Sequence, residues 1–275
     1  MTLYLRLKLK ELLTNPELLG WGVGFVEFWV FMWFFVFSAG TRVETAWEAY
    51  VAKISLSLSY SFLSLISMAS IAISLAYSVL YTSRSARYLT KFTRASPALL
   101  MLEEFLASLA VVIVFVAVIA LSAAGCAYLK WRVTPSLSNP AGVLVDLILG
   151  GTALYWFSYT VALAIIVSRR TRAISMASFL PLILAFVAYS QLWVDFGKLV
   201  YLVPFSTLPA LLVYHSTGII PPTGSYLRWL AGRTAPSINL RLAAISLFAW
   251  ILAFAATSLV LLRKSRGVPI EEIRL

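Results

Sequence analysis

The sequence predicts an all-α membrane protein that crosses the bilayer with six helices and forms a single transmembrane domain over residues 1–275. The first observation is composition: 61% of the residues are hydrophobic and only 12% are charged, whereas about a quarter of a soluble domain is charged. The second is length, because apolar runs of about 20 residues recur, as crossing a hydrocarbon core of about 30 Å requires. Too few charged side chains remain to cover a surface that faces water, so we expect the surface to face lipid.

Local sequence signals support the starts of several spans. Asn15-Pro16, Ser96-Pro97 and Asn139-Pro140 each place a polar side chain and a proline in the order that a helix N-terminus prefers. Pro181 lies inside the fifth span, where it predicts a kink. The six predicted spans are 21–37, 54–81, 102–128, 143–168, 174–194 and 240–262.

Lys and Arg residues predict the orientation, because they concentrate on the cytoplasmic side of membrane proteins. Fourteen of the 22 fall on one side of the predicted spans and cluster at helix ends. Both termini are therefore predicted to be cytoplasmic, in a multi-pass protein of the cell (plasma) membrane. The fourteen are Arg6, Lys8, Lys10, Arg84, Arg87, Lys91, Arg94, Arg169, Arg170, Arg172, Arg263, Lys264, Arg266 and Arg274.

Residues 5–13 are predicted to form a short amphipathic helix that lies in the membrane interface. Leucines recur there at helical spacing, with charged residues between them. This pattern is too short to cross a bilayer. The leucines are Leu5, Leu9, Leu12 and Leu13.

The apolar segment 199–214 could in principle be a seventh span. It is short and contains Pro204 and Pro209, and a seventh crossing would move the basic residues 263–266 to the external side. We therefore interpret it as a re-entrant or interfacial hairpin on the external face, which must pack against the bundle because backbone at that depth needs protein or water around it.

The connection between the second and third spans, residues 84–97, carries four basic residues and no acidic residue, together with Tyr88, Leu89 and Phe92. Tyr88 and Phe92 are four residues apart and would share a helical face with Leu89. A solvated basic loop that only sets topology explains this pattern, and so does a docking helix for a cytoplasmic partner.

The second span contains a stripe of seven serines that covers about half of the helix circumference. Hydroxyls on one face of a helix can hydrate a translocation path, but small residues also allow close helix packing, and both interpretations stay open. Glu27, inside the first span, is a further candidate for the path because an ionisable group at membrane depth usually faces the bundle or water. The serines are Ser57, Ser61, Ser64, Ser67, Ser70, Ser74 and Ser78.

Other acidic residues have simpler interpretations. Asp146 lies just inside the fourth span, and no basic partner for it at membrane depth is evident from the sequence. Glu103 and Glu104 begin the third span, where pairing with Lys91 or Arg94 of the preceding segment is the simplest account. These three acidic residues are therefore assigned no catalytic role.

Several kinds of site are excluded or disfavoured. One cysteine, Cys126, and one histidine, His215, cannot form an intrachain disulfide or a multi-histidine metal site. His215 is interpreted as an interfacial polar residue. Gly20, Gly22 and Gly24 suggest close helix contact, and no GxxxxGK[ST] phosphate loop is present in the sequence. The net charge of +11 is explained by topology, without nucleic acid as a partner.

The order of these parts resembles the membrane (permease) subunit of ATP-binding-cassette (ABC) exporters of the second type. In that family an interfacial helix precedes two spans, and the segment that follows is leucine-rich and ends in a Ser/Thr-Pro pair. Residues 88–100 here read YLTKFTRASPALL, with Ser96-Pro97 as that pair. The family's hairpin before the last span often contains Asn-Pro, and Val203-Pro204-Phe205 stands in its place.

This resemblance implies a transport mechanism. Two such subunits, identical or similar, would pair, and each would bind a separate ATPase subunit that holds ATP and Mg; this chain would hold no cofactor and catalyse no reaction. ATP-driven closure of the ATPase subunits would act on residues 84–97 and on helix 5–13. The second and fifth spans would line the substrate path. The residues implied in coupling are Arg84, Arg87, Tyr88, Leu89, Phe92, Arg94, Ser96 and Pro97.

Two other classes remain as alternatives. A stand-alone secondary carrier or channel would need no ATP, although no internal repeat relates residues 1–137 to 138–275, as many carriers show. A membrane-embedded enzyme or assembly factor is the third class. The sequence does not identify the substrate.

Overall fold

The computed structural model describes residues 3–37, 48–92, 97–132 and 136–265. Those residues form helices and connecting loops, without a β-strand in the described ranges. Within these described ranges, six helical segments are long and apolar enough to cross a membrane, which agrees with the predicted number of spans and with a multi-pass membrane protein. Their bounds are Gly20–Phe37, Ala49–Leu80, Leu99–Trp131, Pro140–Ser168, Ile174–Leu192 and Leu240–Lys264.

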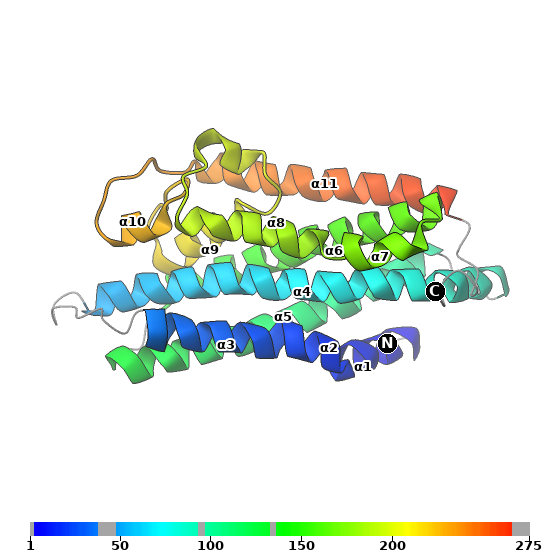
Figure 1. Cartoon of the computed structure of the whole chain (residues 1–275), viewed down its shortest axis with the longest axis horizontal. Coiled ribbons are helices and arrows are strands. Elements are labelled where there is room, and N and C mark those ends of the chain that lie inside the picture. The colour runs from blue at the N-terminus through cyan, green and yellow to red at the C-terminus, as the bar shows by residue number, and fades with distance from the viewer. Residues whose placement is uncertain (1–2, 38–47, 93–96, 133–135, 266–275) are drawn as a thin grey trace.

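The helices lie roughly side by side in one bundle (Figure 1). Short α1 and α2 precede α3, which together with flanking π-helical turns forms the first span. Three long helices, α4, α5 and α6, form the next three spans, and the last span is α11. In chain order the helices are α1 Leu3–Thr14, α2 Pro16–Leu19, α3 Phe25–Phe31, α4 Glu48–Phe92, α5 Pro97–Trp131, α6 Pro140–Ser168, α7 Ile174–Ala177, α8 Leu180–Tyr189, α9 Leu208–Thr217, α10 Tyr226–Leu230 and α11 Leu240–Lys264.

Two ends of the bundle are distinguished below. The α1 end contains α1, the C-terminal parts of α4 and α6, the start of α5 and α7 (right in Figure 1). The α9 end contains α9, α10 and the starts of α4, α6 and α11. By the count of basic residues, we expect the α1 end to face the cytoplasm.

Helix α4 occupies the centre of the bundle. In its apolar window 83% of the residues are buried, against 22% in the first and last spans. It packs against α5, α6, α8 and α9. Small serine side chains along α4 allow these neighbours to approach closely, as in other membrane helix bundles.

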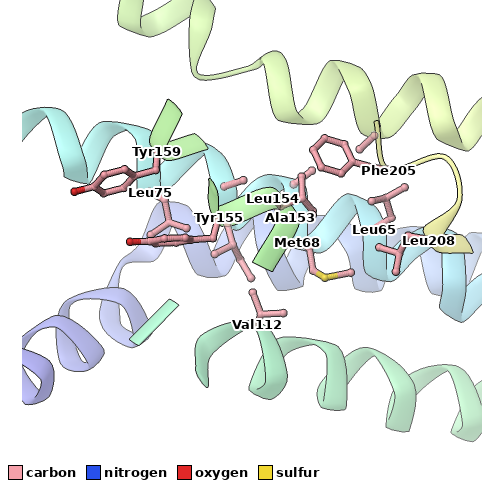
Figure 2. Packing of buried hydrophobic residues seen from close by; sticks show 14 of the residues in the cluster. Leu65, Met68, Leu75, Val112, Ala153, Leu154, Tyr155, Tyr159, Phe205 and Leu208 are labelled. Atoms are coloured by element: carbon pink, nitrogen blue, oxygen red, sulfur yellow. The ribbon is translucent and has the colours of Figure 1, made fainter. Parts of the chain in front are cut away.

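The largest hydrophobic cluster joins α4, α5, α6 and α9 (Figure 2). Met68 of α4, Val112 of α5 and Leu154 of α6 belong to this cluster, and Leu65 of α4 is drawn beside Leu208 of α9. Gly150 of α6 permits the contact with α9, because a Cβ atom at that position would collide with a methyl carbon of Leu208.

The helix starts follow the predicted capping signals where the structure describes them. The Asn15 side chain accepts a hydrogen bond from the Leu18 amide at 3.4 Å, and Asn139 accepts one from the Gly142 amide at 3.0 Å, with Pro140 in the first turn. The third signal, Ser96-Pro97, lies partly outside the described residues. Only Pro97, the first residue of α5, belongs to a described element.

The fifth span is divided into two helices. This span is not one kinked helix. Helix α7 ends at Ala177 and α8 begins at Leu180, with a turn at residues 178–179. Pro181 lies in the first turn of α8, where its missing amide hydrogen breaks no helical hydrogen bond. The prediction of a proline-induced distortion was right, but its form is a break before the proline.

Candidate functional site

A cavity of about 630 Å³ (the larger cavity) lies near the α1 end. The second span (α4) contributes half of its lining residues. The fifth span (α7 and α8) contributes another part, and α1 and the start of the first span complete the wall. A volume of this size is typical of sites for small molecules. The lining residues are Glu11, Asn15, Trp21, Ser70, Ile73, Ser74, Tyr77, Ser78, Phe179 and Leu182.

Local structure positions each wall of this cavity. Ser70, Ser74 and Ser78 recur every four residues, so helix geometry aligns them along one face of α4. The turn between α7 and α8 presents Phe179, which is 46% exposed. Trp21 follows α2, and its ring packs against Phe25 with a centroid distance of 5.3 Å.

A buried lysine lies beside the cavity. Lys8 of α1 is 2% exposed, and its Nζ atom donates a hydrogen bond to the hydroxyl of Ser78 on α4. The same Nζ atom lies 3.6 Å from a carboxylate oxygen of Glu104 on α5 and 3.3 Å from one of Glu11. One side chain thus joins α1 to both α4 and α5.

The sequence predicted neither member of this ion pair as the partner of the other. Lys8 lies inside the bundle although the leucine pattern of α1 predicted it on the polar, solvated face. Glu104 pairs with Lys8, a residue 96 positions away, and the predicted local partners Lys91 and Arg94 have side chains outside the described residues. Charge neutralisation explains the arrangement, since a carboxylate and an ammonium group are each costly to bury alone.

Three acidic side chains are described around Lys8. Burial raises the pKa of the Tyr4 hydroxyl on α1, and the nearby carboxylates of Glu104, Glu11 and Glu103 raise it further. Glu103 is 5% exposed, and its Oε2 atom is buried with no hydrogen-bond partner in the described part of the chain. The α1 end thus combines three carboxylates with one described buried ammonium group.

The predicted path serines divide into two groups. Ser74 lines the cavity. Ser61, Ser64 and Ser67 are completely buried, and none of these three lines it. Ser67 donates a hydrogen bond of 2.6 Å to the carbonyl oxygen of Gly22, so it links the second span to the first.

Close packing accompanies that hydrogen bond. A Cβ atom at Gly22 would lie 2.8 Å from the ring of Phe115 on α5, which confirms the predicted helix contact at this glycine. The remaining path candidate, Glu27, faces α5, where Ser122 is its hydrogen-bond partner. Neither Gly22 nor Glu27 is among the described lining residues of the larger cavity.

The α9 end contains a second polar cluster. His215 Nδ1 of α9 lies 2.6 Å from Asp146 Oδ2 of α6, so Asp146 has a basic partner that the sequence did not reveal. His215 thus joins α9 to α6, a contact that the sequence did not predict. A smaller cavity of about 220 Å³ lies nearby, lined by residues that include Ser57, Tyr60, Lys53 and Ser216.

The predicted coupling residues are only partly described. Helix α4 extends to Phe92, so Arg84, Arg87, Tyr88, Leu89 and Phe92 belong to it. The side chains of these five residues lie outside the described part of the structure, and so do Arg94 and Ser96.

Sequence reasoning missed several cavity residues, above all Glu11, Trp21 and Phe179. Ser70 and Ser78 belonged to the recognised stripe, and their spacing of four around Ser74 was the signal that could have selected them. No family model, curated protein or solved structure matches the chain.

Proposed function

We propose that this protein is the transmembrane permease subunit of an ABC exporter, which forms the substrate path and is driven by a separate ATPase subunit. The observation that carries the proposal is the position of the larger cavity. Its walls come mainly from the second and fifth spans, the two spans that the family resemblance assigns to the path, and it lies near the end of the bundle that is expected to face the cytoplasm.

The length of α4 supports coupling to a cytoplasmic partner. The helix has 45 residues, which at about 1.5 Å each span about 67 Å and exceed the hydrocarbon core of about 30 Å. Its apolar window ends at Leu80, and the helix continues to Phe92. Residues 84–97 would therefore project from the membrane, where an ATPase subunit could bind them, and the same rigid helix carries Ser70, Ser74 and Ser78 in the cavity wall.

Helix α1 fits the role of an interfacial element. Leu3, Leu7 and Leu13 are exposed, at 72%, 56% and 39%, whereas Lys8 and Leu12 face the bundle. Exposed leucines among the exposed basic residues Arg6 and Lys10 on a short helix favour a position in the membrane interface. Through Lys8, movement of α1 would reach α4 and α5, which is the route that closure of the ATPase subunits would use.

Helix α9 fits a re-entrant hairpin. It is only ten residues long, most of its side chains are buried, and it packs against α4, α6 and α11. A segment that enters from the external face and returns needs this protection, because unpaired backbone cannot face lipid. Two copies of this subunit, or this subunit and a similar one, would complete the path.

The test is affinity purification of the tagged chain in mild detergent, with identification of co-purifying chains and an ATPase assay. We expect a stoichiometric partner with a phosphate loop, and loss of both partner and turnover when Arg84, Arg87 and Phe92 are changed to alanine together. The matched control changes Arg228 and Arg233, at the α9 end, to alanine and should retain both.

A different outcome of the same purification would contradict the proposal. If the chain purifies as a stable oligomer without a nucleotide-binding protein, and liposomes that contain it transport substrate without ATP, the protein is a secondary carrier or channel. In that case the proposal is wrong.

A further inference from the structure

The described lining of the larger cavity combines aromatic and apolar side chains with one charged side chain. Trp21, Tyr77 and Phe179 provide rings, and Ser70 and Ser74 provide hydroxyls. Among the described lining residues, Glu11 is the only Lys, Arg, Asp or Glu side chain. The Glu11 side chain is 54% exposed, so its carboxylate is accessible to a bound molecule.

Local charge favours a positively charged occupant. Lys8, the nearest described lysine, is 2% exposed and is shared between Glu11 and Glu104. These three side chains together carry one net negative charge, and buried Glu103 adds another carboxylate nearby. This excess belongs to the ion-pair cluster alone, because the exposed side chains of Arg6 and Lys10 on α1 carry positive charge.

The aromatic walls favour the same kind of occupant. An organic cation is attracted to the face of an aromatic ring, most strongly to that of tryptophan. Trp21 is 58% exposed, so its ring is available. The apolar side chains of Ile73 and Leu182 would contact the hydrophobic part of the same molecule.

We infer that the larger cavity binds an amphipathic organic cation, with its positive charge near Glu11 and Trp21 and its apolar body against the second and fifth spans. This inference rests on the proposed transport function, because it makes that cation the class of substrate that enters the path at the α1 end. An anion of the same shape would meet the Glu11 carboxylate and be disfavoured.

A pair of probes with equal shape and opposite charge tests the inference. Tetraphenylphosphonium is the cation and tetraphenylborate the matched anion. Saturable binding of each is measured by equilibrium dialysis with the full chain in nanodiscs of phosphatidylcholine, and nanodiscs without protein correct for partition into lipid. We expect saturable binding of tetraphenylphosphonium and none, or far weaker binding, of tetraphenylborate.

Variants assign the binding to this cavity. Glu11→Gln should weaken binding of the cation about five-fold and Glu11→Lys further still, because a charge at a partly exposed site contributes moderately. Trp21→Leu should weaken it about three-fold through loss of the ring. The matched control is Trp193→Leu at the α9 end, where the side chain is 54% exposed, and it should bind like the wild type.

Equal binding of both probes, or unchanged binding of the cation in both Glu11→Gln and Trp21→Leu, would overturn the inference. Because Glu11 contacts Lys8, each variant is first checked for a monodisperse size-exclusion profile, and Trp21→Leu tests the cavity without altering the ion pair. The assay contains no ATPase subunit. If the cation does not bind but an ATPase subunit co-purifies with the chain, only the substrate class is refuted. If the cation binds but no ATPase subunit co-purifies, only the exporter function is refuted.

Discussion

Lys8 of α1 and Glu104 of α5 form an ion pair inside the bundle, with 3.6 Å between Nζ and Oε1 and side chains that are 2% and 6% exposed. Lys8 also donates a hydrogen bond to Ser78 of α4. An N-terminal helix that could lie loosely on a membrane surface is thereby attached to α4, which includes residues 84–92, and to α5, which begins at Pro97. The first prediction concerns this attachment.

Replacing Lys8 by methionine should destabilise the protein by about 3 kcal/mol, because the Glu104 carboxylate would remain buried without its partner. The measurement is the free energy of unfolding in detergent, or the corresponding shift in melting temperature. The double variant Lys8→Met, Glu104→Gln should recover part of this loss, since it removes both charges. Additive losses in the double variant would show that the two side chains do not interact.

The contact at Gly22 predicts a position-specific effect in the first span. Gly22→Ala should destabilise the fold by about 1–3 kcal/mol, because the new methyl group would meet the Phe115 ring at 2.8 Å. Gly24→Ala is the matched control, since its nearest contact is the Leu19 carbonyl oxygen at 3.8 Å. Thermal denaturation of both variants distinguishes them, and equal stability of the two would contradict the packing described here.

The pair Asp146–His215 should hold α9 on α6. Asp146→Leu removes the acceptor and leaves the imidazole without this partner, which should cost about 1–3 kcal/mol. We expect faster amide hydrogen exchange over residues 208–217, measured by mass spectrometry, with little change in α1. Unchanged exchange in α9 would mean that apolar packing alone, such as Leu208 against Gly150, holds the helix.

Accessibility should separate the two groups of serines. After Cys126, the single native cysteine, is replaced by serine, Ser74→Cys should react with a water-soluble maleimide because position 74 lines the cavity. Ser61→Cys and Ser64→Cys should react far more slowly, since both positions are completely buried. Mass spectrometry measures the fraction labelled, and rapid labelling of all three would indicate that a water-filled path extends along α4.

Two serines of the same stripe should differ in how much their hydroxyl groups contribute to stability. Ser67→Ala loses the hydrogen bond to the Gly22 carbonyl and should cost about 1 kcal/mol. Ser61→Ala should be neutral or stabilising, because the Ser61 hydroxyl is buried with no hydrogen-bond partner among the described residues. Melting temperatures of the two variants in the same detergent test the difference, and a larger loss for Ser61→Ala would reverse this assignment.

The sequence by itself determined the number of spans, their approximate bounds and several helix starts. These properties depend on local physics: about 20 apolar residues are needed to cross the hydrocarbon core, and Asn15 and Asn139 cap helices whose first residues follow them directly. The predicted contact at Gly22 belongs here too, because a glycine in an apolar helix commonly marks a close approach.

Only the tertiary structure decided which polar groups meet. Lys8 and Glu104 are 96 positions apart and Asp146 and His215 are 69 apart, and no local pattern relates the members of either pair. Burial made each pairing necessary, because an isolated charge in an apolar bundle is too costly. The same packing decided that Ser74 faces a cavity while Ser61 and Ser64 face neighbouring helices, since that depends on where α1, α2 and α8 meet α4 rather than on the serine stripe alone.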